Sequence, residues 1–151
     1  MTSNPLLQET IYVSAAVTPF GPRDLTALLL AARSNNRRLG ISGILVHQAG
    51  SFFQVLEGEP QRVAALFDHI ERDPRHHKVL VLAQQNLTTR AFAEWSMGFV
   101  EAGQAGLADM PGFNDFFGQA RSITQLPASA QHVKQLLLAF RGGRFRRYVD
   151  V

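Results

Sequence analysis

The chain of 151 residues contains no cysteine. This absence excludes disulfide bonds, thiolate metal sites, iron–sulfur ligation and cysteine nucleophiles. Charged residues are also few: 18% of the chain is charged and 46% is apolar, a balance that excludes a disordered polypeptide. No apolar run is long enough to span a bilayer, and the first ten residues lack the pattern of a secretory leader. These absences fit a single cytoplasmic domain without a membrane partner.

The net charge is only +3, and thirteen of the fifteen basic residues are arginines. Four arginines crowd into the last eleven residues: Arg141, Arg144, Arg146 and Arg147. A nucleic-acid-binding protein usually shows a broader basic face with interleaved aromatic residues. We therefore expect a solvated or partner-facing tail, and we do not expect a nucleic-acid partner.

Apolar periodicity and turn residues predict the element order βαββαββ. Strands are expected over 11–15, 41–47, 52–57, 79–83 and 92–100, and 79–83 is expected to be a buried strand. One helix starts at Pro22 and stops near Asn35 and Asn36, with Gly40 closing the connection; the other runs from Pro60 to Asp73. Two right-handed crossovers would place both helices on one face of a five-stranded mixed sheet, which is a ferredoxin-like α+β sandwich.

A last helix is predicted over 128–140, because four apolar residues follow helical spacing there: Val133, Leu136, Leu137 and Phe140. We expect it to cover the free face of the sheet, which would otherwise expose apolar side chains. The chain thus divides into a main domain over 1–100 and a C-terminal helical extension with a basic tail over 101–151. The apolar stripe and the basic end together could also meet a second subunit.

The usual catalytic motifs are missing. The chain has no phosphate-binding glycine loop and no serine nucleophile elbow, and its carboxylates are scattered. His76 and His77 are adjacent, so they suit two directions better than one metal ion, and we expect no metal site. A hydrolase of a familiar type is not expected.

Three polar residues stand at positions that should face the core. Gln54 lies on the same face of its strand as Leu56, Tyr12 opens a short central strand, and Asn36 ends the first helix. A buried amide without a partner costs roughly 1–3 kcal/mol. Each residue also has an ordinary interpretation, since Asn often caps helices and Tyr often packs in strands.

Taken together, these residues belong to a specific set of motifs: I-Y-V-S around Tyr12, N-N-R-R-L-G-I-S-G-I-L-V-H, G-S-F-F-Q-V-L-E-G, D-P-R-H and F-A-E-W-S-M. The set closely resembles the BLUF family, the blue-light sensors that use FAD, over about residues 10–100. Ser42 stands where the family often has Thr, which retains the hydroxyl.

The resemblance implies a photoreceptor and not an enzyme, with FAD bound noncovalently and its ring inserted between the two helices. Leu28 and Ile70 would sandwich the ring, and Asn36, with Asn35 beside it, would bind its polar edge. The family's D-x-R-H positions near the ring edge and ribityl chain match Asp73, Arg75 and His76. Leu28 and Ile70 could instead be core residues, and D-P-R-H also reads as a plain helix stop.

The resemblance also implies the mechanism. Tyr12 would donate an electron and then a proton through Gln54. Gln54 would then rearrange, by rotation or tautomerisation, and form a stronger hydrogen bond to the flavin C4 carbonyl. The stronger bond would shift the absorption to the red. An amide suits this role because it carries donor and acceptor at one end. Trp95 and Met97, two residues apart in the last strand, would relay the change, unless they simply pack at its edge.

With no second effector domain in the sequence given, the signal is expected to leave through a downstream protein partner or a change in a homo-oligomer, a dimer or larger. Two alternatives stay open. One is a ferredoxin-like ligand-binding or scaffold domain without photochemistry, and the other is a light-independent flavin enzyme.

Overall fold

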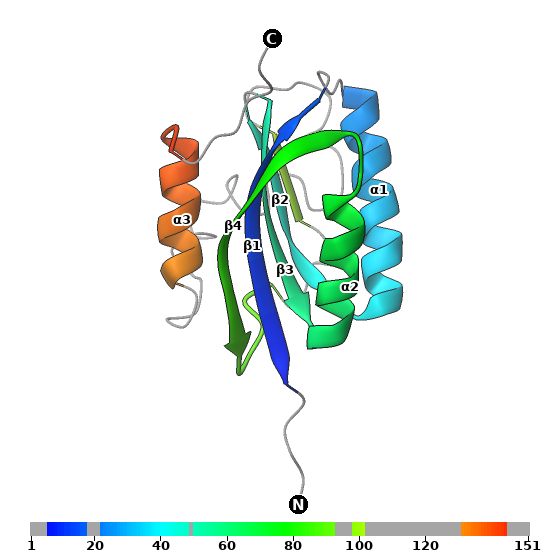
Figure 1. Ribbon diagram of the computed structural model, residues 1–151, viewed down its shortest axis with the longest axis vertical. Coiled ribbons are helices and arrows are strands. Elements are labelled where there is room, and N and C mark those ends of the chain that lie inside the picture. Colours follow the sequence, from blue (N-terminus) through cyan, green and yellow to red (C-terminus); the bar gives the residue numbers. More distant parts are fainter. Residues whose placement is uncertain (1–5, 18–21, 49, 93–97, 102–130, 145–151) are drawn as a thin grey trace, which may run out of the picture.

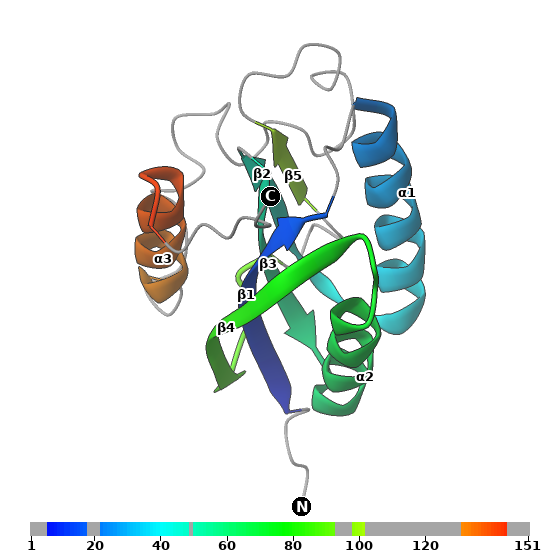
Figure 2. The ribbon, with the colours of Figure 1, turned by 45° about the horizontal axis from the view of Figure 1, so that its top comes forward.

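A computed structural model describes residues 6–17, 22–48, 50–92, 98–101 and 131–144. Its strands are β1 (Leu7–Ala16), β2 (Ser42–Gln48), β3 (Ser51–Gly58), β4 (His76–Leu87) and β5 (Gly98–Glu101). They form one sheet in the order β4-β1-β3-β2-β5 (Figure 2). β1 pairs antiparallel with β3 and β4, β2 pairs antiparallel with β3, and β5 joins β2 in parallel. The sheet is therefore mixed.

The helices lie on opposite faces of this sheet. α1 (Pro22–Leu39) and α2 (Pro60–Glu71) cover one face, and α3 (Gln131–Arg141) lies on the other (Figure 1). α1 connects the parallel strands β1 and β2, and α2 connects the parallel strands β3 and β4. This arrangement confirms the predicted ferredoxin-like sandwich and the predicted place of the last helix.

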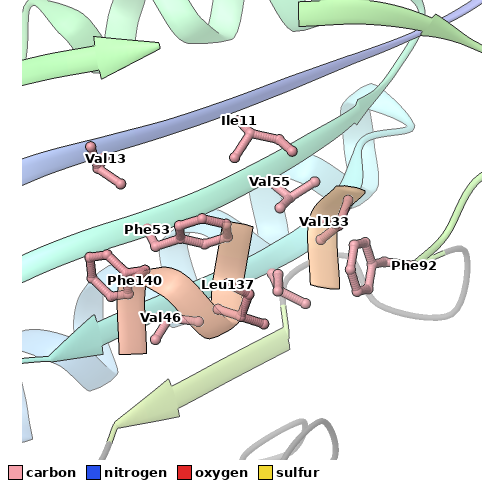
Figure 3. Packing of buried hydrophobic residues seen from close by; sticks show 10 residues of the cluster. Ile11, Val13, Val46, Phe53, Val55, Phe92, Val133, Leu137 and Phe140 are labelled. Atoms are coloured by element: carbon pink, nitrogen blue, oxygen red, sulfur yellow. The ribbon is translucent and has the colours of Figure 1, made fainter. Parts of the chain in front are cut away.

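Alternation along the strands gives the sheet two separate cores. Phe52 and Leu56 of β3 face α1 and α2, where they pack with Val63. Phe53 and Val55 face α3 and meet its buried stripe, which consists of Val133, Leu137 and Phe140 (Figure 3). The rings of Phe53 and Phe140 are 5.4 Å apart between centroids. Gln54 shares the face of Leu56, as its position in the strand predicts.

The predicted end of the first helix is wrong by one turn, because α1 continues through Asn36 to Leu39. The helix ends where Gly40 adopts φ +69°. The backbone N–H of Ile41 donates to the carbonyl of Asn36 at 2.8 Å, and that of Gly40 reaches the carbonyl of Arg37 at 3.4 Å. This left-handed cap favours glycine, so Gly40 and not the asparagine pair stops the helix.

Two strand predictions also need correction. The segment 79–83, predicted as a buried strand, belongs to the edge strand β4, where Leu80 and Val81 are 39% and 40% exposed. In the segment 92–100, Phe92 is not in a strand and packs in the core under α3, β5 is described over Gly98–Glu101, and residues 93–97 lie outside the described residues. Among the described helices, none combines the length and the apolar character needed to cross a bilayer.

Candidate functional site

A cavity of about 340 Å³ opens between α1, α2 and the sheet. This volume falls in the range of small-molecule sites, roughly 300–1,000 Å³. The cavity is lined by all nine predicted site residues that lie in the described ranges: Tyr12, Leu28, Asn35, Asn36, Gln54, Ile70, Asp73, Arg75 and His76. The predicted relay residues, Trp95 and Met97, lie outside the described residues.

Tyr12 and Gln54 form the polar centre of the cavity. They are direct cross-strand partners of β1 and β3 and point toward the same face of the sheet. The Tyr12 hydroxyl donates a hydrogen bond to Oε1 of Gln54. Only 3% of Tyr12 and 5% of Gln54 is exposed. Burial, and then the negative charge of Asp73, raise the pKa of Tyr12, so the phenol stays protonated and remains the donor of this bond.

Two helices supply the cavity walls. Leu28, Ala32 and Asn36 follow one another at four-residue intervals on α1, so they lie on one face of the helix. Leu66 and Ile70 make the matching stripe on α2. The two walls are mostly aliphatic and face each other across the cavity, an arrangement that suits a flat aromatic ring better than a compact polar ligand.

Asn36 and Asn35 occupy different environments. Asn36 is 2% exposed and lines the cavity from within α1, three residues before the helix ends at Leu39. Asn35 is half-buried, and its Oδ1 accepts a hydrogen bond from Arg38 at 2.5 Å. A side-chain amide carries one acceptor and two donors, so Asn36 brings a polar group to the wall of the cavity.

The segment that follows α2 carries three of the lining residues: Asp73, Arg75 and His76. Nε of Arg75 donates to both oxygens of Asp73 at 3.0 and 2.9 Å, and Nη2 reaches Oδ2 at 2.5 Å. These bonds to Arg75 hold the pKa of Asp73 below its usual value. His76 is held at both ring nitrogens, with Nδ1 2.8 Å from Ser14 Oγ and Nε2 2.5 Å from the carbonyl of Ile70.

Six further lining residues were not singled out from the sequence as binding residues. They are Ala31, Ala32, Leu45, Phe52, Leu66 and His69. Helical spacing could have found four of them, since Ala31 and Ala32 follow Leu28 at i+3 and i+4, Leu66 precedes Ile70 by four residues, and His69 follows Leu66 at i+3. Leu45 and Phe52 carried no such signal, because apolar strand residues ordinarily serve the core.

The chain is similar to known proteins in sequence and in structure. The family model "Sensors of blue-light using FAD" matches residues 7–98. The beta subunit of photoactivated adenylate cyclase from Euglena longa is 34% identical over 127 residues, which make up 83% of this chain and 14% of that protein. The chain therefore spans only about a seventh of that relative.

Solved structures are also similar to this chain. A manganese/cy-diGMP complex of BlrP1 from Klebsiella pneumoniae matches 91% of this chain and 33% of its own, with 31% identity and a TM-score of 0.72. The dark-state structure of the BLUF protein BlrB matches 89% of this chain and 96% of its own, with 26% identity and a TM-score of 0.64. With the family model covering most of the sandwich, the chain belongs to the BLUF family, the sensors of blue light that use FAD.

Proposed function

We propose that this chain is a blue-light photoreceptor, not itself an enzyme, that holds FAD noncovalently between α1 and α2. The observation that carries the proposal is the buried Tyr12–Gln54 hydrogen bond in a cavity with aliphatic walls. Bound FAD would supply the absorption of blue light and an oxidising excited state.

The residues of the cavity fit a flavin. Leu28 and Ile70 offer apolar contact to the two faces of a ring, while Asn36 and Gln54 offer amide donors and acceptors to its polar edge. Asp73 and Arg75 lie at the end of α2, where they can serve the ring edge and the ribityl chain, with His76 beside them. Noncovalent binding is supported by the lack of cysteine in the chain and by His76, whose two ring nitrogens already have partners.

In the proposed photocycle, Tyr12 gives up an electron and its hydroxyl proton. The proton leaves along the hydrogen bond to Gln54, which is the partner of the hydroxyl in the structure. Gln54 then rearranges, by rotation or tautomerisation, and persists in the new state after both the electron and the proton have returned to Tyr12. Gln is suited to the step because Asn is shorter and an ionised Glu could not donate.

We further propose the path by which the signal leaves the cavity. Trp95 and Met97 precede β5 in the sequence and would pass on the state of Gln54. The sensor would comprise residues 1–100, and residues 101–151 would form a cap and output extension. This division is supported by the family match, which ends at residue 98. The receiver of the signal would be a downstream protein or a second copy of the chain in a homo-oligomer. We propose a cytoplasmic location, which is consistent with the lack of cysteine.

The absorption difference between illuminated and dark protein tests the photochemistry. A yellow protein whose flavin spectrum shifts to the red under blue light and recovers in the dark is the expected result. A colourless protein would favour a scaffold domain. A flavin that stays unshifted in light but turns over with an added reductant would favour a flavin enzyme.

Light scattering coupled to size-exclusion chromatography, in dark and in light, tests the output. A dimer or larger assembly is expected, with a mass or an elution volume that responds to light. A monomer in both states would leave only the separate protein partner as receiver.

A further inference from the structure

A row of polar side chains crosses the sheet on the face that α3 covers. Gln85 of β4 is the cross-strand partner of Glu9 in β1, Glu9 is the partner of Glu57 in β3, and Glu57 is the partner of Ser42 in β2. Glu9 stands two residues before Ile11, and Glu57 two residues after Val55, both of which pack under α3. Both glutamates are fully buried.

Glu57 has a complete set of partners. Its Oε1 accepts from Ser42 Oγ at 2.9 Å and from the N–H of Phe92 at 3.0 Å, and its Oε2 accepts from the N–H of Ala91 at 2.7 Å. Arg90 donates to Ser42 Oγ at 2.9 Å and to the backbone carbonyl of Glu57 at 3.2 Å. Glu57 thus binds the segment 90–92 to the sheet.

Glu9 depends on α3 instead. Its Oε1 lies 2.5 Å from Nε2 of His132 and accepts from Nε2 of Gln85 at 3.2 Å. Its Oε2 is buried and makes no hydrogen bond within the described part of the chain. Among the described residues, His132 is therefore the one group able to carry a positive charge that contacts this carboxylate, and it lies 123 residues further along the chain, in α3.

We propose that the Glu9–His132 contact is a pH-sensitive latch that holds α3 on the sheet. An imidazole changes its charge between about pH 5 and about pH 8. In its charged form it makes a charge-assisted hydrogen bond to a carboxylate, which is roughly twice as strong as a neutral one. As the pH rises through this range, the latch weakens and α3 stays attached mainly through Val133, Leu137 and Phe140.

The charged groups around His132 set the sign of this effect. Glu9 faces it from β1, Glu57 stands behind Glu9 in β3, and Arg90 lies beyond Glu57. Gln85 of β4 is uncharged, and its amide nitrogen Nε2 lies 2.8 Å from the same His132 Nε2 that faces Glu9. Burial raises the pKa of Glu57, so Glu57 can also gain charge as the pH rises. A new negative charge behind Glu9 favours the charged imidazole and would therefore strengthen the Glu9–His132 contact. A contact that weakens at higher pH must then reflect the loss of charge on His132.

Amide hydrogen exchange of the dark, FAD-loaded full chain tests the latch without any photochemistry. Protection factors of α3, corrected for intrinsic rates, are compared between about pH 5.5 and about pH 8. In the wild type, α3 should lose protection about fivefold to tenfold, which is the difference between a charged and a neutral hydrogen bond, while β3 amides keep theirs. His132→Gln and Glu9→Gln should remove this pH dependence.

Two further variants make the test specific. His77→Gln changes an exposed histidine of the edge strand β4 and should leave the pH dependence of the wild type intact. Glu57→Gln should retain it as well, because Glu57 does not contact His132. The latch is refuted if α3 protection is flat with pH in the wild type, if β3 loses protection equally, if His132→Gln still responds, or if Glu57→Gln alone abolishes the response.

Discussion

Replacing Tyr12 by Phe tests both the structure of the site and its proposed chemistry. The ring can keep its place, including its tilted contact with Phe67 at 5.5 Å between centroids. What disappears is the hydroxyl that donates to Gln54. The variant should therefore still bind FAD and remain yellow, but give no red-shifted product under blue light, because no proton can leave along the bond to Gln54.

The same change has a thermodynamic consequence that follows from burial. Oε1 of Gln54 loses its donor while the residue is only 5% exposed, so water cannot easily replace the hydroxyl. A buried acceptor left without its partner costs about 1–3 kcal/mol, and the added apolar character of Phe offsets part of that. We expect the free energy of unfolding to fall by about 1–2 kcal/mol, measured by urea denaturation of dark protein at saturating FAD.

Thr10→Val is the matched control for this experiment. Thr10 lies two residues before Tyr12 on the same strand, and its hydroxyl is buried but makes no hydrogen bond within the described residues. Its removal should leave the photocycle normal and the stability equal or higher, since no partner is orphaned. A normal red shift in Tyr12→Phe would refute the role of Tyr12, and equal losses of stability in both variants would refute the value assigned to the hydrogen bond.

Three further changes test the rest of the site. Gln54→Leu should retain FAD but abolish the red shift in the light-minus-dark spectrum, because no amide remains to rearrange; a surviving shift would place the switch elsewhere. Asn36→Ala should lower FAD occupancy after gel filtration or alter the dark spectrum, and unchanged values would exclude Asn36 from the binding edge. Asp73 has a pKa held below its ordinary value by Arg75, so its stabilising effect is complete above that ordinary value and is lost as the pH falls through the lowered one. Asp73→Asn should flatten this acid-side loss in a pH series of urea midpoints, whereas an unchanged acid limb would contradict it.

Strand periodicity predicted the sidedness of the fold well. In β3, alternation placed Gln54 on the same face as Leu56 and placed Phe53 on the other face. The structure has Leu56 and Phe53 on opposite faces, as predicted. Periodicity was weaker at element ends and edges. The first helix continues past Asn36 because the left-handed cap at Gly40 determines its end. The burial of Leu80 depends on whether its strand has a neighbouring strand on each side, and a run of apolar residues in the sequence does not indicate this.

Pairings across the sequence were harder to predict than faces. The Tyr12–Gln54 contact joins residues 42 positions apart, and only the register of β1 on β3 brings them opposite each other. The family resemblance, not periodicity, connected the two residues. No comparable guide existed for Glu9 and His132, although alternation alone puts a glutamate on the apolar face of β1, two residues from Ile11.

The two faces of the sheet are connected through the same pair of strands. β1 carries Tyr12 on the cavity face and Glu9 on the face under α3, three residues apart, while β3 carries Gln54 and Glu57 in the same relation. An odd spacing in a strand puts side chains on opposite faces, and the short distance leaves little chain between them to absorb a shift. Gln54 of β3 therefore lies three residues from the carboxylate that holds the segment 90–92, and that carboxylate is the cross-strand neighbour of Glu9, which contacts His132 of α3.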